Sequence, residues 1–265
     1  MYSYCNFFMV ARLLDSQILS QIDSPKPGLE NMTLDESMLD RIPAGITAML
    51  RVYRWSQPTL SLGHFQTMPE GNVAPWSNLP RVTRKTGGGA IVHHHEITYC
   101  IAIASSSLAS KKGHHEKLYR AVHDSIVDAL RGLGWNAQLS ENCTCNINSG
   151  IGRSPFLCFD RRSPVDVVID GKKIVGSAQR RTSQGLIQHG SILLRSSVHA
   201  PHLPGILDID RFNSLEKSKV SLRENAFPDA EPVKAKDATP SCLESQLNEE
   251  WCVEIVNRGL FLALS

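Results

Sequence analysis

The sequence predicts an α+β domain built on a mixed, largely antiparallel sheet flanked by helices. The chain has 265 residues, of which 42% are hydrophobic and 20% charged, so it can bury a sizeable core. Short runs rich in β-branched and aromatic residues recur along it, at least one of them as a clear hairpin. Stretches with helical periodicity alternate with these runs, which favours an antiparallel or mixed sheet.

In the first part of the chain, the first 25 or so residues are expected to be a loosely attached extension. Residues 31–42, NMTLDESMLDRI, follow as an amphipathic helix with acidic residues early. The runs LRVYRW and TLSLGHF indicate two strands joined by a turn around Pro58. RVTRK (81–85) leads as a strand into three glycines. Residues 90–104, AIVHHHEITYCIAIA, then form one long strand or a hairpin, in which Ile97, Tyr99 and Ile101 share one face.

In the second part, residues 116–132 are the clearest helix, because Leu118, Val122, Ile126 and Leu130 recur at every fourth position before two glycines end it. The run VDVVIDGKKIVGSAQ predicts a hairpin whose two-residue turn is Asp170-Gly171. GLIQHGSILL adds a strand. Residues 227–241 are polar and contain proline, which indicates a linker or surface loop, and LESQLNEEWCVEIVNRGLF predicts a terminal helix.

Composition excludes several classes of function. A net charge of +2 gives no indication of nucleic-acid binding, and no run of 18 apolar residues indicates a membrane span. The N-terminus lacks the pattern of a signal peptide, so we expect a cytoplasmic protein whose seven cysteines are free thiols. Cys143-Thr-Cys145 resembles half of a metal site, but no second Cys or His pair has zinc-site spacing, so no metal is expected.

The glycine stretch RKTGGGAIVHHHEITYC, at 84–100, could bind a phosphate, a metal ion or another ligand. A Walker loop needs a lysine after spaced glycines and a helix next, whereas here three glycines are contiguous and β-type sequence follows. Contiguous glycines let backbone N–H groups approach a ligand closely. On a strand, His93 and His95 face one way and His94 the other, so a metal site is a weak interpretation and a core or surface role is the usual one.

Two further motifs carry reactive side chains. SPFLCFD places Cys158 between aromatic residues, and KKIVGSAQRR places Lys173 three residues before a Gly-Ser-Ala run. Without further motifs, we would expect Cys158 to be a small buried residue and Lys173 to be a solvated one.

Taken together, NMTLDESML, VYRWSQPTLSLGHFQ, RKTGGGAIVHHHEITYC, CFDRRSPVDVVIDGKKIVGSAQRR and IQHGSILL resemble, in this order, the lipoate–protein ligase A and octanoyltransferase family. The resemblance spans roughly residues 30–225. It implies an α+β catalytic domain related to biotin–protein ligase. We therefore divide the chain into an N-terminal extension (1–28), the catalytic domain (29–225), and a linker with a C-terminal helix packing on that domain (226–265).

The family holds two chemistries, and the motifs favour one of them. Ligases activate free lipoate with ATP, whereas transferases take octanoate from acyl carrier protein and hold it on a cysteine. Cys158 matches the nucleophile of the ligase-like octanoyltransferases, and Glu96 matches their motif at a position where ligases tend to carry Gly. The chain also lacks room for the ligases' full accessory domain. Gly89 departs from the transferase pattern, which often has Arg there, and His94 stands where both branches usually have Asp.

The resemblance also implies the roles of the site residues. Cys158 would be the nucleophile, since a thiolate attacks and leaves well, and the Lys173 ammonium would stabilise the thiolate and the developing oxyanion. His64, Phe65 and Ala90 would form part of the wall of an acyl slot. The residues expected to bind substrate are Arg84, Gly87, Gly88, Gly89, Ala90, His93, Gly176, Ser177, Ala178 and His189.

The implied activity is octanoyl transfer from acyl carrier protein to a lysine of a lipoyl domain, either glycine cleavage H protein or a 2-oxoacid dehydrogenase E2. No cofactor is expected for this reaction. Three alternatives stay open: a lipoate ligase that needs ATP and Mg, an octanoyl amidotransferase between lipoyl domains, and a non-catalytic acyl-binding module. The acidic partner proteins would be steered by the basic residues Arg84, Lys85, Lys111, Lys112, Arg161, Arg162, Arg180 and Arg181.

Overall fold

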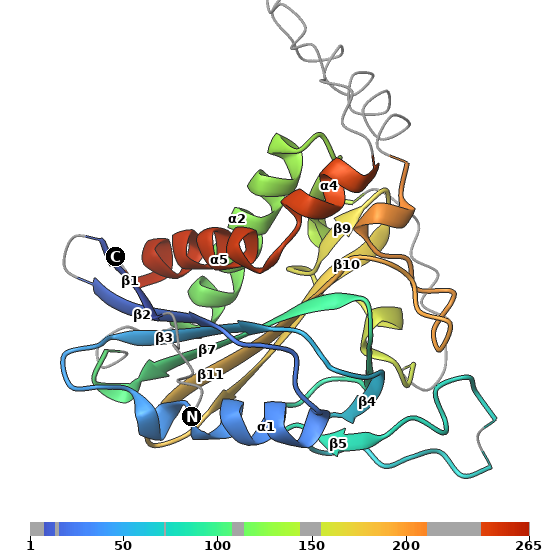
Figure 1. The fold of residues 1–265 in the computed structure, drawn as a ribbon, viewed down its shortest axis with the longest axis horizontal. Coiled ribbons are helices and arrows are strands. Elements are labelled where there is room, and N and C mark those ends of the chain that lie inside the picture. The colour runs from blue at the N-terminus through green and yellow to red at the C-terminus, as the bar shows by residue number, and fades with distance from the viewer. Residues whose placement is uncertain are drawn as a thin grey trace, which may run out of the picture.

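The computed structural model describes residues 8–13, 16–71, 73–107, 114–143, 155–210 and 240–264. Its centre is an eight-stranded sheet in the order β1-β2-β3-β7-β11-β10-β9-β8, in which β2 and β3 run parallel and the other neighbours antiparallel (Figure 1). The predicted α+β fold with a mixed, largely antiparallel sheet is confirmed. The strands are β1 (Phe8–Leu13), β2 (Ser16–Ile22), β3 (Ala48–Tyr53), β7 (Glu96–Ala104), β8 (Ala137–Leu139), β9 (Val167–Ile169), β10 (Lys172–Arg181) and β11 (Gly185–Leu193).

The two faces of this sheet are covered differently. Helices α2 (His114–Gly132) and α5 (Glu249–Leu264) lie on one face, with α4 (Pro240–Gln246) beside them. Helix α1 (Gly28–Ser37) and a three-stranded sheet, β5-β4-β6, lie on the other (Figure 1). The small sheet consists of β4 (Thr59–Leu62), β5 (Arg81–Thr83) and β6 (Ile91–His93). None of the helices in the described segments is long and apolar enough to cross a membrane.

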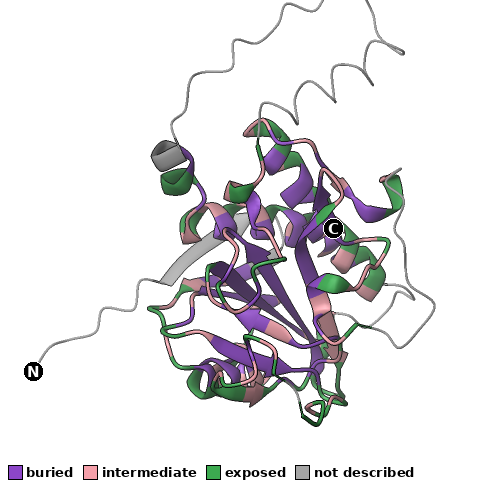
Figure 2. Cartoon of the chain, turned by 90° about the vertical axis from the view of Figure 1, so that its right-hand side faces the viewer, coloured by how far each residue is buried: buried purple, intermediate pink, exposed green. Residues whose placement is uncertain are grey.

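Strand β7 shows why the two faces have different roles. Its large apolar residues Ile97, Tyr99 and Ile101 all belong to the main core, together with the apolar stripe of α2, as predicted. The alternate residues, which include Thr98 and Cys100, are smaller and point to the face under α1 and the small sheet. Both faces are buried (Figure 2). The main sheet therefore packs against an apolar core on one side and leaves space under α1 and the small sheet on the other.

The β9–β10 hairpin sets the position of Lys173. Asp170 and Gly171 have φ values of 47° and 75°, as a two-residue hairpin turn requires, so the predicted turn is confirmed. The register then shifts between Lys173 and Val175, which marks a β-bulge. Because of this bulge, Ile174 and Val175 both enter the main core, and Lys173 lies on the same face as Gly176 instead of the opposite one.

Several predicted elements differ from the observed ones. Residues 16–22 are not loosely attached, because β2 pairs with β3 inside the main sheet. Residues 90–104 are neither one strand nor a hairpin: β6 and β7 belong to different sheets. The same is true of β3 and β4, which the sequence joins by a turn. Two-sided burial and sheet membership are non-local properties, so local patterns could not separate these strands.

The C-terminal region also differs in detail from the prediction. The predicted terminal helix is two helices, α4 and α5, separated at residues 247–248. Helix α5 packs closely on α2: a Cβ at Gly259 would lie 2.6 Å from the Cα of Val122. Most of the predicted linker, residues 227–239, lies outside the described residues.

A buried arginine fastens α1 to the main sheet. The guanidinium of Arg51, on β3, is fully buried and lies 2.6 Å from Asp23 and 2.7 Å from Asp35. It also donates to the side chain of Asn31 at 2.7 Å and stacks over the ring of Tyr53 at 3.8 Å. Asn31 and Asp35 are one turn apart on α1, so one side chain holds two successive turns of the helix against the sheet.

We expect Arg51→Met to lower the free energy of unfolding by about 3–5 kcal/mol, because it leaves the fully buried Asp35 carboxylate without its cation. Arg54→Met is the matched control. Arg54 pairs with Glu249, but both side chains are partly exposed, so its loss should cost at most about 1 kcal/mol. Urea unfolding of the two variants measures the difference. Equal losses would show that the buried pair has no special role.

Candidate active site

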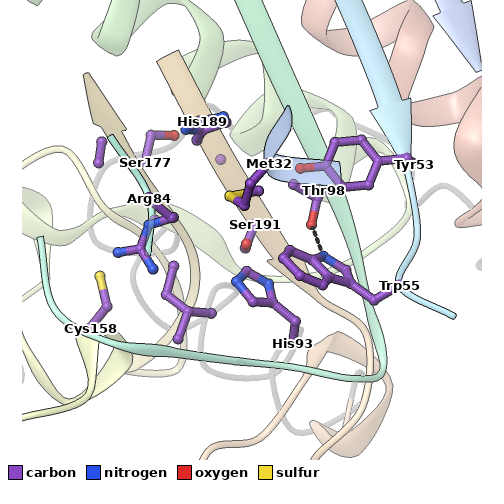
Figure 3. Close-up of a pocket in the computed structure, with 14 residues that line it drawn as sticks. Met32, Tyr53, Trp55, Arg84, His93, Thr98, Cys158, Ser177, His189 and Ser191 are labelled. Atoms are coloured by element: carbon purple, nitrogen blue, oxygen red, sulfur yellow. Dashed lines mark hydrogen bonds between the residues drawn. The ribbon is translucent and has the colours of Figure 1, made fainter. Parts of the chain in front are cut away.

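A cavity lies between the main sheet, α1 and the small sheet (Figure 3). It encloses about 380 Å³ of space free of protein atoms, a volume that includes open solvent at its mouth. In Figure 3, Cys158 and Arg84 lie at one end and Tyr53 and Trp55 at the other. Its lining residues are Met32, Tyr53, Trp55, Arg84, Ile91, His93, Thr98, Cys158, Gly176, Ser177, Ala178, His189, Gly190 and Ser191.

Cys158 is held at the cavity by pairing between distant parts of the chain. It begins a short 3-10 turn, Cys158–Asp160, and its N–H donates to the Ala90 carbonyl at 2.7 Å. Ala90 in turn donates to Phe156 at 3.0 Å. This close pairing explains Gly89, because a Cβ there would lie 2.8 Å from the backbone of Cys158. The same Cβ would lie 2.9 Å from Arg161 Nε, so a side chain at position 89 needs the 158–161 turn to move.

The Lys173 amine lies beside Cys158. Its Nζ is 3.9 Å from the Cys158 sulfur and 3.2 Å from the Cys158 carbonyl oxygen. It also donates to the Arg161 carbonyl at 3.3 Å and forms a 2.8 Å ion pair with Asp166. Both charged side chains are almost fully buried. Burial raises the pKa of the Asp166 carboxyl, and the Lys173 charge opposes this rise.

Arg84 organises the glycine loop from inside. Its guanidinium donates to the carbonyls of Gly89 at 2.7 Å and Ser61 at 2.9 Å, and also contacts the Ser61 hydroxyl and the Gly87 carbonyl. Burial lowers the pKa of Arg84 to about 10, an effect opposed by nearby Cys158, so the group stays charged at neutral pH. Gly88 has a φ of 94°, a conformation that favours glycine. With its carbonyls bound to Arg84, the loop is fixed in shape.

His93 lies at the far end of the cavity, and both nitrogens of its ring are engaged. Its ring stacks on Trp55 at 3.8 Å, and its two nitrogens contact Ser61 at 2.5 Å and Glu96 at 2.6 Å. Glu96 also accepts from Thr98 at 2.6 Å. Burial lowers the pKa of His93, although Glu96 opposes this, so the ring is neutral at neutral pH. Glu96 therefore orients a cavity-wall histidine.

Beneath the floor of the cavity, Asp35, Cys100 and His189 offer three ligand-type atoms within 4.8 Å of one another. The Asp35 carboxylate already binds Arg51 and accepts from the Tyr53 hydroxyl at 2.6 Å. Burial raises the pKa of the Cys100 thiol well above its usual value, so it is neutral. A cationic guanidinium and a protonated thiol do not suit a metal ion. The group fits better as the support of His189, whose Nε2 lies 2.9 Å from Asp35.

A second buried network lies under β10, on the side of α2. The Tyr99 hydroxyl contacts the Ser177 hydroxyl at 2.6 Å, which contacts His123 Nε2 at 2.7 Å. His123 Nδ1 donates to the Val165 carbonyl at 2.5 Å. The Ser177 side chain is thus engaged with the helix side of the sheet. Burial lowers the pKa of His123 to about 4, so this ring is neutral in the folded protein.

Most of the predicted site residues come together. Cys158, Arg84, His93, Gly176, Ser177, Ala178 and His189 line the cavity, and Lys173 touches Cys158. Gly87, Gly88 and Gly89 form the loop bound by Arg84, and Ala90 is fully buried where it pairs with the segment before Cys158. Their roles as substrate ligands stay predictions, as does the absence of a metal or cofactor.

Some expected placements are wrong. His64 and Phe65 are exposed, Phe65 to 89%, so they do not form a wall of the cavity. His94 and His95 do not alternate across a strand, because β6 ends at His93 and their rings stack on one another at 3.6 Å. Arg84 is buried and cannot steer partner proteins. Lys111 and Lys112, expected to do the same, lie outside the described residues.

Sequence reasoning missed Asp166, Asp35, Met32 and Trp55. Asp166 precedes an apolar strand, where an acidic residue is usually taken for part of a turn. Asp35 belongs to the predicted amphipathic helix of residues 31–42 and has no predicted role of its own there, yet it is fully buried. Of these four residues, only Asp166 could have been expected, because a buried lysine such as Lys173 needs a carboxylate partner nearby.

Solved structures with the same fold include lipoate–protein ligases. A bipartite ligase of Thermoplasma acidophilum matches with a TM-score of 0.52 and 18% identity, covering 94% of this chain and 98% of that one. A lipoate–protein ligase A bound with ATP matches with a TM-score of 0.51 and 18% identity, covering 91% and 100%. The model of the lipoyl protein ligase A/B catalytic domain matches residues 27–228, and the chain belongs to that family. The resemblance stated from the motifs is confirmed.

Within the family, similar curated proteins are octanoyltransferases. Octanoyltransferase LipM of Lysinibacillus sphaericus is 32% identical over 240 residues, covering 88% of this chain and 82% of the relative. LipM of Kyrpidia tusciae is 36% identical over 170 residues, covering 62% of this chain. The aligned part spans 61% of the Kyrpidia protein.

The buried His123 makes stability depend on pH. Its pKa is about 4 when folded and near 6.5 in the unfolded chain, so the unfolded state binds more protons between these values. The free energy of unfolding should therefore fall by about 3 kcal/mol from this group as the pH drops from 6.5 to 4. Urea unfolding across this range measures the slope in wild type and His123→Gln. The variant should have a shallower slope, and identical slopes would refute the assignment.

Proposed function

We propose that this protein is an octanoyltransferase of protein lipoylation, which moves an octanoyl group from acyl carrier protein to a lipoyl-domain lysine through a thioester on Cys158. The observation that carries the proposal is the Cys158 thiol at one end of a mostly apolar cavity, 3.9 Å from a buried lysine amine. The family and the relatives named octanoyltransferase LipM support the reaction class.

In the first step, the Cys158 thiolate attacks the carbonyl carbon of the octanoyl thioester. A carbon–sulfur bond to Cys158 forms, the bond to the carrier's thiol breaks, and that thiol leaves with a proton. The Lys173 ammonium faces the sulfur and can stabilise both the thiolate and the negative oxygen of the tetrahedral intermediate. Because Asp166 and two backbone carbonyls bind the same amine, it is already oriented before substrate arrives.

In the second step, the neutral amine of the acceptor lysine attacks the Cys158 thioester. An amide bond forms, the carbon–sulfur bond breaks, and the proton lost by the amine passes to the departing Cys158 thiolate, which restores the thiol. A thioester is already activated, so neither step needs ATP. The apolar part of the cavity holds the alkyl chain. At about 0.8 kcal/mol per buried CH₂, seven carbons contribute roughly 5–6 kcal/mol of binding.

The acceptor is a lipoyl domain of the H protein or E2 type. A T. acidophilum ligase with this fold has been studied together with its E2 lipoyl domain, which supports a protein acceptor. Basic residues at the surface can attract acidic partners, and those that are partly or fully exposed include Lys85, Arg161, Arg162, Arg180 and Arg181.

The leading alternative is an ATP-dependent lipoate ligase, in which Cys158 would be dispensable. Gly89 is the feature that favours it, since T-G-G-G-A is the ligase form. The amidotransferase alternative shares Cys158 with the proposal and differs only in its donor. The acyl-binding module predicts binding without turnover.

Intact-mass measurement after mixing with octanoyl acyl carrier protein tests the proposal. We expect the mass of one octanoyl group on the wild type without ATP, and none on Cys158→Ala. Cys143→Ala is the matched control, because Cys143 is also a free, partly exposed thiol. Transfer to a lipoyl domain by Cys158→Ala at the wild-type rate would refute the thioester. Lipoylation from free lipoate only with ATP would favour the ligase.

Gly176→Ala tests whether the position of Lys173 matters. A Cβ at Gly176 would lie 2.7 Å from Lys173 Cε and 3.0 Å from its Nζ, so the end of the lysine side chain must leave its present position. We expect the rate of acyl transfer to fall roughly 10²-fold. Gly132→Ala is the control, since its Cβ would meet nothing within 4 Å. Normal transfer by a folded Gly176→Ala variant would contradict the role given to Lys173.

A further inference from the structure

The far end of the cavity shares one lining side chain with a second, outer groove. The groove lies between α1 and β5, and its lining residues are Leu29, Met32, Thr33, Glu36, Arg81, Val82 and Thr83. Met32 lines the inner cavity as well. It is the one residue common to both linings, and it packs with Tyr53 and Trp55 at the end of the cavity opposite Cys158.

The wall around Met32 is apolar. Met32, Tyr53 and Trp55 form a small buried cluster, against which Val82 packs. Tyr53 and Trp55 face the cavity, Val82 faces the groove, and Met32 faces both. Truncating Met32 would therefore remove the residue that faces both spaces, whereas truncating a residue that faces the groove alone would not.

The backbone of Met32 is held in place on both sides. Its neighbour Asn31 and the next buried residue of α1, Asp35, are both bound by Arg51. One turn earlier, Gly28 lies so close to the small sheet that a Cβ would be 2.9 Å from Trp55. Helix α1 cannot move outward without breaking these contacts. The Met32 side chain, which is unbranched and fills space adaptably, is therefore carried on a backbone that is held in place.

We propose that Met32 closes the far end of the acyl cavity and sets the longest acyl chain that the protein accepts. The inference rests on the proposed function, in that the cavity must hold an alkyl chain with its carbonyl at Cys158. A chain that reaches Met32 gains nothing from further methylenes unless the wall opens into the groove. Substitution with a smaller residue then admits longer chains, and substitution with a larger one shortens the accepted chain.

Calorimetric binding of hexanoate, octanoate, decanoate and dodecanoate tests this on the intact chain. The wild type should bind octanoate best, with no gain for the longer acids. Met32→Ala should bind dodecanoate at least roughly tenfold more tightly than the wild type does, because each buried methylene adds affinity. Met32→Phe should move the preference towards hexanoate and is the second variant if Met32→Ala does not fold. Leu29→Ala and Thr33→Ala, which face the groove alone, should keep the wild-type preference.

The outcomes separate the two claims. A wild type that binds none of these acids, and takes up no acyl group from carrier protein, refutes the proposed function. A wild type that binds octanoate while the folded Met32 variants keep its chain-length preference overturns the inference alone. Wild-type affinity that keeps rising to dodecanoate also overturns it, because the cavity would then not be closed at Met32.

Discussion

A buried ammonium needs a negative partner, and the Lys173–Asp166 ion pair meets that need directly beside Cys158. Without Asp166, the amine would have to leave the interior or lose its charge, because an unpaired buried charge is very costly. The β-bulge after Lys173 and the missing side chain of Gly176 make room for the pair. The proposed transfer depends on this arrangement, since it places a fixed positive charge where a thiolate and an oxyanion would form.

The cavity exists because the main sheet has two unlike faces. Large apolar residues of β7 pack against α2 and α5, whereas the small residues of the opposite face leave space under α1 and the small sheet. Arg51 closes that space by holding α1 in place, and Met32, carried on α1, forms its far wall. One buried guanidinium thus links the stability of the fold to the length of the proposed acyl site.

The sequence predicted correctly those elements whose structure depends on neighbouring residues alone. The Asp170-Gly171 turn and helix α2 follow from backbone preference and periodicity. Family motifs indicated Cys158 and Lys173 as partners, but alternation along β10 could not: the bulge that turns Lys173 towards Gly176 leaves no trace in a period-2 pattern. The burial of Asp35 could not be predicted from the local sequence either, because it depends on Arg51, which is sixteen residues away and on another element.

The rate at which iodoacetamide alkylates Cys158 at neutral pH tests the central claim most directly, with Cys143 as the internal reference. If the Lys173 charge favours the thiolate across 3.9 Å, Lys173→Met should slow alkylation of Cys158 roughly tenfold and leave Cys143 unchanged. Peptide mass spectrometry resolves the two sites. Equal Cys158 rates in the wild type and the folded variant would contradict the account.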